Sequence, residues 1–121
     1  MSRALIDSNV LIDFLAGNPA ARAELDRYAE PGISVVSWIE VIAGIAPERD
    51  RIARGFLAKF ERFELTAKIA EQAAAIRRTG RMKLPDAIIL ATAQENHLLL
   101  VTRNTRDFPE DTPGVRNPYR I

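Results

Sequence analysis

The chain changes from a strand pattern to a helix pattern within residues 4–15, which read ALIDSNVLIDFL. Residues 4–6 form a short apolar run of the kind found in buried strands. Residues 7–9 then supply Asp, Ser and Asn, which can cap a helix, and the helix predicted after them ends at Gly17. A strand followed at once by a capped helix is half of a βα unit, and its repetition predicts a parallel sheet covered by helices.

The same alternation continues along the chain. We expect further strands at residues 33–36, 63–65, 98–102 and 114–121, and helices at 19–30, 37–44, 48–62, 66–78 and 86–95. Strands separated by helices predict an α/β fold with a central, mostly parallel sheet and helices on both faces. Sites in such sheets form outside the carboxyl ends of the strands.

Composition limits the class of protein. A chain of 121 residues with 47% apolar residues is long enough for one globular domain, which we assign to 1–121. The absence of cysteine excludes disulfides, thiolate metal sites and a cysteine nucleophile. A net charge of +1 means that any binding of nucleic acid depends on local basic patches. We read no signal peptide and no membrane span, and therefore expect a cytoplasmic protein without membrane partners.

Four acidic residues are candidates for a site, and each also has a structural explanation. Asp7 can act as a helix N-cap, and Asp86 lies in the first turn of its helix, where an acid is favoured by the helix dipole. Glu40 follows Ser37 by three residues, as in a capping box. Asp107 lies in a loop after a strand, where an Asx turn accounts for it.

These structural explanations still bring the four acids to one place. Each acid lies in a helix that begins at the carboxyl edge of the sheet or in a loop that leaves a strand at that edge. The helix at 86–95 has almost no polar face, so Asp86 is expected to be partly buried and to need a partner. Clustered carboxylates repel one another unless a cation compensates, and Mg²⁺ or Mn²⁺ prefers oxygen ligands of this kind. Such a site can activate water for attack on a phosphodiester.

Other catalytic arrangements are absent from the sequence. No glycine-rich dinucleotide motif follows the first strand, and no Walker-type lysine loop is present. His97 is the only histidine and is expected on the surface, which excludes a pair of histidines acting as acid and base.

Four blocks of the chain resemble the PIN-domain ribonucleases, in particular the VapC-like toxins. The blocks are residues 5–13, 37–44, 84–93 and 100–108, which read LIDSNVLID, SWIEVIAG, LPDAIILATA and LVTRNTRDF. They occur in the family's order and span nearly the whole chain. The resemblance implies a three-layer α/β/α PIN domain that forms a homodimer and acts as the endoribonuclease toxin of a type II toxin–antitoxin pair.

The resemblance also implies site residues, a cofactor and partners. It carries catalytic and metal-binding roles onto Asp7, Glu40 and Asp86, with Mg²⁺ as cofactor and Mn²⁺ as a substitute. Many PIN domains have an acid at the position of Asn104, whereas VapC-like members often have Asn there, followed by an acid at the position of Asp107. We therefore assign the fourth acidic role to Asp107. Auxiliary roles fall to Ser8, Asn9, Thr102 and Asn104. RNA is the implied substrate, an antitoxin encoded nearby is the implied partner, and DNA is contacted only through the antitoxin.

Two other functions are compatible with the same residues. The chain can be a non-catalytic module that binds an antitoxin and serves regulation only, or another small metal-dependent phosphohydrolase such as a phosphatase. Cleavage of RNA that requires metal and Asp7 distinguishes the first alternative, and a phosphomonoester assay distinguishes the second.

Basic and apolar segments add two further expectations. Residues 77–83, which read RRTGRMK, together with Arg103 and Arg106, are either solvated loops or guides for a phosphate backbone. The stripe of Ile52, Phe56 and Phe60 is expected to pack in the core. The resemblance places the antitoxin groove between early helices, in the segment from Trp38 to Phe60.

Overall fold

The computed structural model describes residues 3–109 and 111–120. Its strands are β1 (Ala4–Ile6), β2 (Gly32–Ser34), β3 (Glu61–Phe63), β4 (Leu99–Val101) and β5 (Val115–Arg116). Its α-helices are α1 (Ser8–Leu15), α2 (Pro19–Leu25), α3 (Val35–Gly44), α4 (Asp50–Leu57), α5 (Ala67–Thr79) and α6 (Leu84–Glu95), with a 3₁₀ turn η1 (Pro47–Arg49) before α4. No helix within the described ranges has the length and apolarity needed to cross a membrane.

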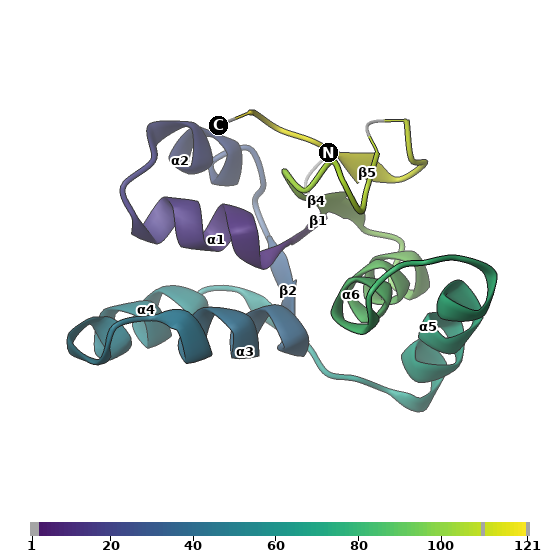
Figure 1. The fold of residues 1–121 in the computed structure, drawn as a ribbon. Helices are drawn as coiled ribbons and strands as arrows, with labels where there is room; N and C mark the ends of the chain where they lie inside the picture. Colours follow the sequence, from purple (N-terminus) through teal and green to yellow (C-terminus); the bar gives the residue numbers. More distant parts are fainter. Residues whose placement is uncertain (1–2, 110, 121) are drawn as a thin grey trace.

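The five strands form one parallel sheet in the order β3-β2-β1-β4-β5. Helices α1 to α4 lie on one side of the strands, and α5 and α6 lie on the other (Figure 1). The fold is therefore the predicted three-layer α/β/α arrangement. Since the chain runs outward from β1 to β3 and then returns to place β4 on the other side of β1, the topological switch point lies between β1 and β4.

Alternating side chains of the central strands fill the cores on the two faces. Ile6 and Val101 pack with α1 to α4, whereas Leu5 and Leu100 pack against α6 and Phe108. A third cluster joins α5 to α6 through small residues such as Ala73 and Ala87. This packing fixes the central strands, from whose carboxyl ends the site extends.

Several predicted boundaries were wrong. The segment 33–36 was expected to be a strand with a helix from Ser37, but the strand ends at Ser34 and Val35 already belongs to α3. The side chain of Ser34 accepts a hydrogen bond from the Val36 amide and caps the helix, so the two β-branched residues after it are helical.

The segment 48–62 was expected to be one helix, but α4 ends at Leu57 and residues 61–63 pair with β2 as β3. The predicted strand at 63–65 is therefore two residues late. The strand predicted at 114–121 is limited to Val115–Arg116, and its last residue, Ile121, lies outside the described residues.

Candidate active site

The four predicted acids line one cleft of about 230 Å³. We call it the carboxylate cleft. Its lining residues are Asp7, Ser8, Asn9, Glu40, Lys83, Pro85, Asp86, Asn104 and Asp107. The residues come from the end of β1, from α3, from the start of α6 and from the loop after β4, and the structure thus brings together positions that lie far apart in the sequence.

Asp7 occupies the switch point between β1 and β4 and is only 4% exposed. Its Oδ2 accepts a hydrogen bond of 2.8 Å from the Thr102 hydroxyl, and its Oδ1 accepts one of 2.7 Å from the Ser8 amide. The side-chain Nδ2 of Asn9 donates to Asp7 Oδ2 at 3.3 Å and to Thr102 Oγ1 at 3.1 Å. Burial raises the pKa of Asp7 more than these hydrogen bonds lower it. Asp7 is thus an N-cap and also a buried carboxylate held in one orientation.

The hydroxyl group of Ser8 connects Glu40 to Asp7. The Ser8 Oγ donates to Glu40 Oε1 at 2.9 Å and lies 3.5 Å from Asp7 Oδ1. The capping-box explanation for Glu40 was wrong, because Ser34 caps α3 and Glu40 lies in the middle of that helix. Ser37 is fully buried, and its Oγ has no hydrogen-bond partner among the described residues.

Asp86 and Asp107 face each other across the cleft. Burial, a hydrogen bond with Asp107 and the negative charges of Asp107, Asp7 and Glu40 together raise the pKa of Asp86 to about 7. The pKa of Asp107 is lowered, chiefly by a hydrogen bond from Asn104 and also by the charges of Lys83 and Arg106. Below about pH 7 the two carboxyl groups therefore hold one proton between them, on the side of Asp86.

Asn104 supports Asp107 through both atoms of its amide. Its Nδ2 donates to Asp107 Oδ2 at 2.8 Å, and its Oδ1 accepts from the Asp107 backbone amide at 3.2 Å. The Asx turn expected at Asp107 starts instead at Asn104, whose side-chain oxygen accepts the backbone hydrogen bond, and Asp107 lines the cleft. Because the amide of Asn104 is neutral and both of its polar atoms contact Asp107, this residue fits a supporting role.

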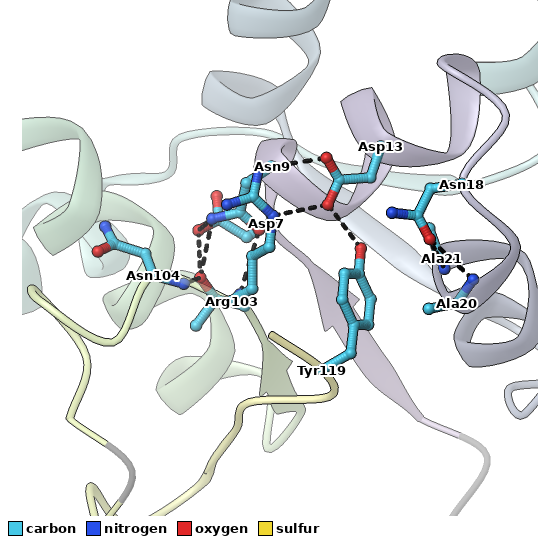
Figure 2. A network of polar contacts seen from close by, with 10 residues as sticks. Asp7, Asn9, Asp13, Asn18, Ala20, Ala21, Arg103, Asn104 and Tyr119 are labelled. Carbon is cyan, nitrogen blue, oxygen red and sulfur yellow. Dashed lines mark hydrogen bonds and ion pairs between the residues drawn. The ribbon is translucent and has the colours of Figure 1, made fainter. Parts of the chain in front are cut away.

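Arg103 belongs to a separate network that adjoins the cleft (Figure 2). Its guanidinium forms two hydrogen bonds with Asp13, at 2.6 and 3.2 Å, and the Tyr119 hydroxyl donates to the same carboxylate at 2.8 Å. The Arg103 backbone amide donates to Asn9 Oδ1 at 3.3 Å, which links this network to Asp7. Arg103 was expected either to be solvated or to guide phosphate, and in the structure its guanidinium pairs with Asp13.

Sequence reasoning gave Asp13 no role, although a usable signal was present. Asp13 is 8% exposed within an otherwise apolar helix, and a buried acid requires a partner, which is the argument that was applied to Asp86. Burial raises the pKa of Asp13, but the hydrogen bonds from Arg103 and Tyr119 outweigh it and leave the pKa below its ordinary value. The basic segment 77–83 also reaches the site, because Lys83 lines the carboxylate cleft.

The chemistry of the carboxylate cleft fits a hydrated divalent cation. Its lining holds four carboxylates and one lysine, so negative charge is in excess, and this charge adds to burial in raising the pKa of Asp86. Within the described ranges, no three His, Cys, Asp or Glu side chains form a group that could hold a metal ion unaided. Mg²⁺ keeps several waters and takes only one or two carboxylates directly, and an open cleft of this kind suits that preference.

A second, apolar groove of about 470 Å³ lies at the other end of α1. It is lined by Phe14, Leu15, Leu25, Asp26, Pro31, Ile52, Gly55, Phe56, Lys59 and Phe60. Phe56 stacks on Phe14 with 4.5 Å between ring centroids, and Phe60 meets Phe56 edge-on at 5.1 Å. Phe56 and Phe60 pack against the core as expected, but Ile52 does not, being 60% exposed. Trp38, the predicted start of the groove segment, instead lies between the guanidinium groups of Arg54 and Arg62.

Comparisons with known proteins agree with this geometry. The family profile described as PIN domain matches residues 4–110. The chain is 38% identical over 113 residues to Ribonuclease VapC10 of Mycobacterium tuberculosis, covering 87% of this chain and 85% of the relative. It is 31% identical over 129 residues to the tRNA(fMet)-specific endonuclease VapC of Shigella flexneri, covering 96% of each.

A solved structure extends the likeness to three dimensions. A chain of a toxin–antitoxin complex from Klebsiella pneumoniae is 42% identical, with a TM-score of 0.92 over 98% of this chain and 99% of that one. Sequence and fold thus agree, and the chain belongs to the PIN-domain family, within its VapC-like ribonucleases.

Proposed function

We propose that the carboxylate cleft hydrolyses phosphodiester bonds of RNA with the help of Mg²⁺, for which Mn²⁺ can substitute, and that the chain acts as an endoribonuclease toxin. The observation that carries the proposal is the charge of the cleft. Burial, together with the hydrogen bond and the negative charges of the facing acids, raises the pKa of Asp86 to about 7, and four carboxylates in one cleft call for a cation. Similarity to VapC ribonucleases supports RNA as the substrate.

In this proposal Asp7, Glu40, Asp86 and Asp107 would hold the cation. When bound, the cation supplies positive charge for the phosphate and acidifies a coordinated water. Thr102 and Asn9 hold Asp7 in place, and Ser8 aligns Asp7 with Glu40. Asn104 holds Asp107 toward the cleft. The carboxyl group of Asp86 would have to lose its proton to hold a cation, so metal binding would be favoured by rising pH.

We also propose that a co-encoded antitoxin inhibits the enzyme, and that DNA contact occurs through the antitoxin alone. The likeness to a chain of a toxin–antitoxin complex supports the partner. The apolar groove offers a site for an amphipathic segment of that partner, and an arginine extending from the segment fits the carboxylate cleft as a competitor of the metal. A homodimer, and a cytoplasmic location where RNA is accessible, complete the proposal.

The test is RNA cleavage by purified full-length protein with and without chelator. EDTA should abolish cleavage, Mg²⁺ or Mn²⁺ should restore it, and Asp7→Asn should remain folded and inactive. Glu71→Gln, which removes an acid from the exposed face of α5, is the matched control and should keep full activity. Full activity in excess EDTA contradicts the metal mechanism. Absence of cleavage in all conditions favours a non-catalytic module, and preference for a phosphomonoester favours a phosphatase.

A further inference from the structure

A third hollow, which we call the side cleft, opens directly beside the carboxylate cleft. It measures about 380 Å³, and its wall includes Ile76, Arg81, Met82, Arg106, Asp107 and Pro109. Asp107 also lines the carboxylate cleft, so the two hollows share a wall. A chain-like ligand that enters one can therefore continue into the other.

The side cleft combines two unpaired cations with apolar side chains. Arg81 and Arg106 take part in none of the ion pairs formed within residues 3–109 and 111–120, whereas Arg54, Arg62, Arg103 and Arg116 do. Ile76, Met82 and Pro109 supply apolar surface between them. A ligand that suits this lining has an anionic group and a flat, weakly polar group close together, as a nucleotide has.

The position of the cations favours a nucleic acid over an acidic peptide. Lys83 lines the carboxylate cleft, and together with Arg106 its charge lowers the pKa of Asp107. The cations thus form a path that leads to the acids. An acidic peptide lying across the shared wall would bring its own carboxylates against Asp107, whereas a phosphodiester backbone is the group that the acids with their cation are suited to receive.

We propose that the side cleft binds the nucleotide next to the cleaved bond of a single-stranded RNA. Its phosphate lies between Arg81 and Arg106, and its base packs on Met82 and on the guanidinium planes, in the way unstacked bases pack on arginine. This inference rests on the proposed function and adds a substrate-binding subsite to it. It separates the roles of two neighbouring arginines, since Arg103 is held by Asp13 and Arg106 is left for the substrate.

The first experiment measures binding without cleavage. Asp7→Asn protein is titrated, in Mg²⁺ buffer, into a fluorescein-labelled pool of single-stranded RNA 12-mers of random sequence, and anisotropy is recorded at several salt concentrations. Adding Arg81→Gln and Arg106→Gln should weaken binding about tenfold and reduce the slope of log Kd against log salt by about 1. Met82→Ala should weaken binding without changing the slope. The charge-matched control, Arg22→Gln with Arg51→Gln, changes residues outside both clefts and should leave both quantities unchanged.

The second experiment measures cleavage by the protein with Asp7 intact. This experiment uses Arg81→Gln alone, because the charge of Arg106 also acts on Asp107. The variant should raise KM about threefold and change kcat by less than about twofold, because Arg81 lies in the side cleft and does not touch the reacting atoms. Absence of cleavage by the unmodified protein counts against the proposed function, while the binding result decides the subsite separately. The subsite is overturned if the pool does not bind, if both arginine pairs weaken binding equally, or if labelled polyglutamate depends on Arg81 and Arg106 while RNA does not.

Discussion

At Asp86, burial and the charges of three other acids act in the same direction, and the pKa of this carboxyl group rises to about 7. Asp7 is shifted in the same sense by burial, whereas Asp107 is shifted the opposite way by Asn104 and by nearby cations. In the metal-free protein the cleft therefore stores unfavourable charge that appears as pH rises. The charge of Asp86 therefore lowers the free energy of unfolding of the metal-free protein, and this effect can be measured.

We predict that Asp86→Asn stabilises the metal-free protein at pH 8. A pKa raised above the unfolded value near 3.8 means that the folded state binds the extra proton, so stability is full below pH 4 and is lost as pH rises through about 7. Asn does not ionise and escapes this loss, which we set at about 1 kcal/mol for a partly exposed group, or about 4 °C in melting temperature. Thermal unfolding in EDTA at pH 5 and pH 8 measures the effect. Equal melting temperatures of the two proteins at pH 8 would show that the charge is already compensated.

A second residue-scale prediction ranks the acids. Asp7→Asn should lower kcat more than about 100-fold, and Glu40→Gln, which keeps its hydrogen bond from Ser8, should lower it about 10- to 100-fold. Glu40→Gln should not change stability, because Ser34 and not Glu40 caps α3. Asp107→Asn should lose less activity than Asp7→Asn, since Asp107 is the more exposed and the less constrained ligand. Single-turnover cleavage and thermal unfolding give both quantities. An equal loss at Asp107 would mean that the ranking of the ligands is wrong.

At the scale of elements, one ion pair and one hydrogen bond tie the C-terminal segment to the first two helices, and both end on buried carboxylates. Arg116 on β5 donates to both oxygens of Glu24 on α2, at 2.7 and 2.9 Å. Tyr119 reaches Asp13 on α1, where the guanidinium of Arg103 is bound. The loop that carries Asn104 and Asp107 begins at this network, so the positions of the acids depend on contacts that cross the whole chain.

We predict that Arg103→Met destabilises the fold by about 2 kcal/mol, because it leaves the nearly buried carboxylate of Asp13 without its ion-pair partner. It should also raise the Mn²⁺ concentration needed for half-maximal cleavage, since the adjoining loop carries Asp107. Arg54→Met breaks an exposed pair with Asp50 and should cost about 1 kcal/mol or less, without affecting the metal requirement. Urea unfolding and a Mn²⁺ titration check both parts. Equal metal requirements in the two variants would reduce Arg103 to a purely structural role.

The same elements show how far sequence reasoning reaches. The strand at residues 4–6 and the helix ends at Gly17 and Gly80 were correctly predicted. A buried apolar run favours a strand and a glycine ends a helix through local effects alone. Val35 and Val36 were placed in a strand because β-branched residues favour strands, but the cap at Ser34 and the pairing of β2 decide otherwise. Arg103 and Asp13 are 90 positions apart in the sequence, and no local sequence pattern predicts that they form a pair.

On the scale of the whole molecule, α1 separates the two main surfaces. Its first residues, Ser8 and Asn9, line the carboxylate cleft, and its last residues, Phe14 and Leu15, line the apolar groove. A helix of 8 residues is about 12 Å long, so about four residues of extended chain bridge the two surfaces. The fold thus lets one short partner segment fill the groove and still reach the acids. The meeting of the acids at one edge of the sheet was foreseeable from the order of strands and helices. For the groove, the resemblance indicated the segment 38–60, but not the residues of α1 and α2 that complete its wall.

The last prediction concerns this groove and the antitoxin. Ile52→Glu places a charge on an exposed apolar side chain of the groove and should weaken the complex with the co-encoded antitoxin about thirtyfold or more, as loss of a central apolar contact does. Leu65→Glu makes the same change on an exposed leucine outside the groove and should leave the complex intact. Both variants should cleave RNA at the normal rate when free, because neither residue lines the carboxylate cleft. The measurement is antitoxin affinity by calorimetry, beside RNase activity at a fixed antitoxin concentration, where only Ile52→Glu should remain active. If both variants bind the antitoxin equally well, the partner lies elsewhere and the groove has another occupant, even though the nuclease assignment stands.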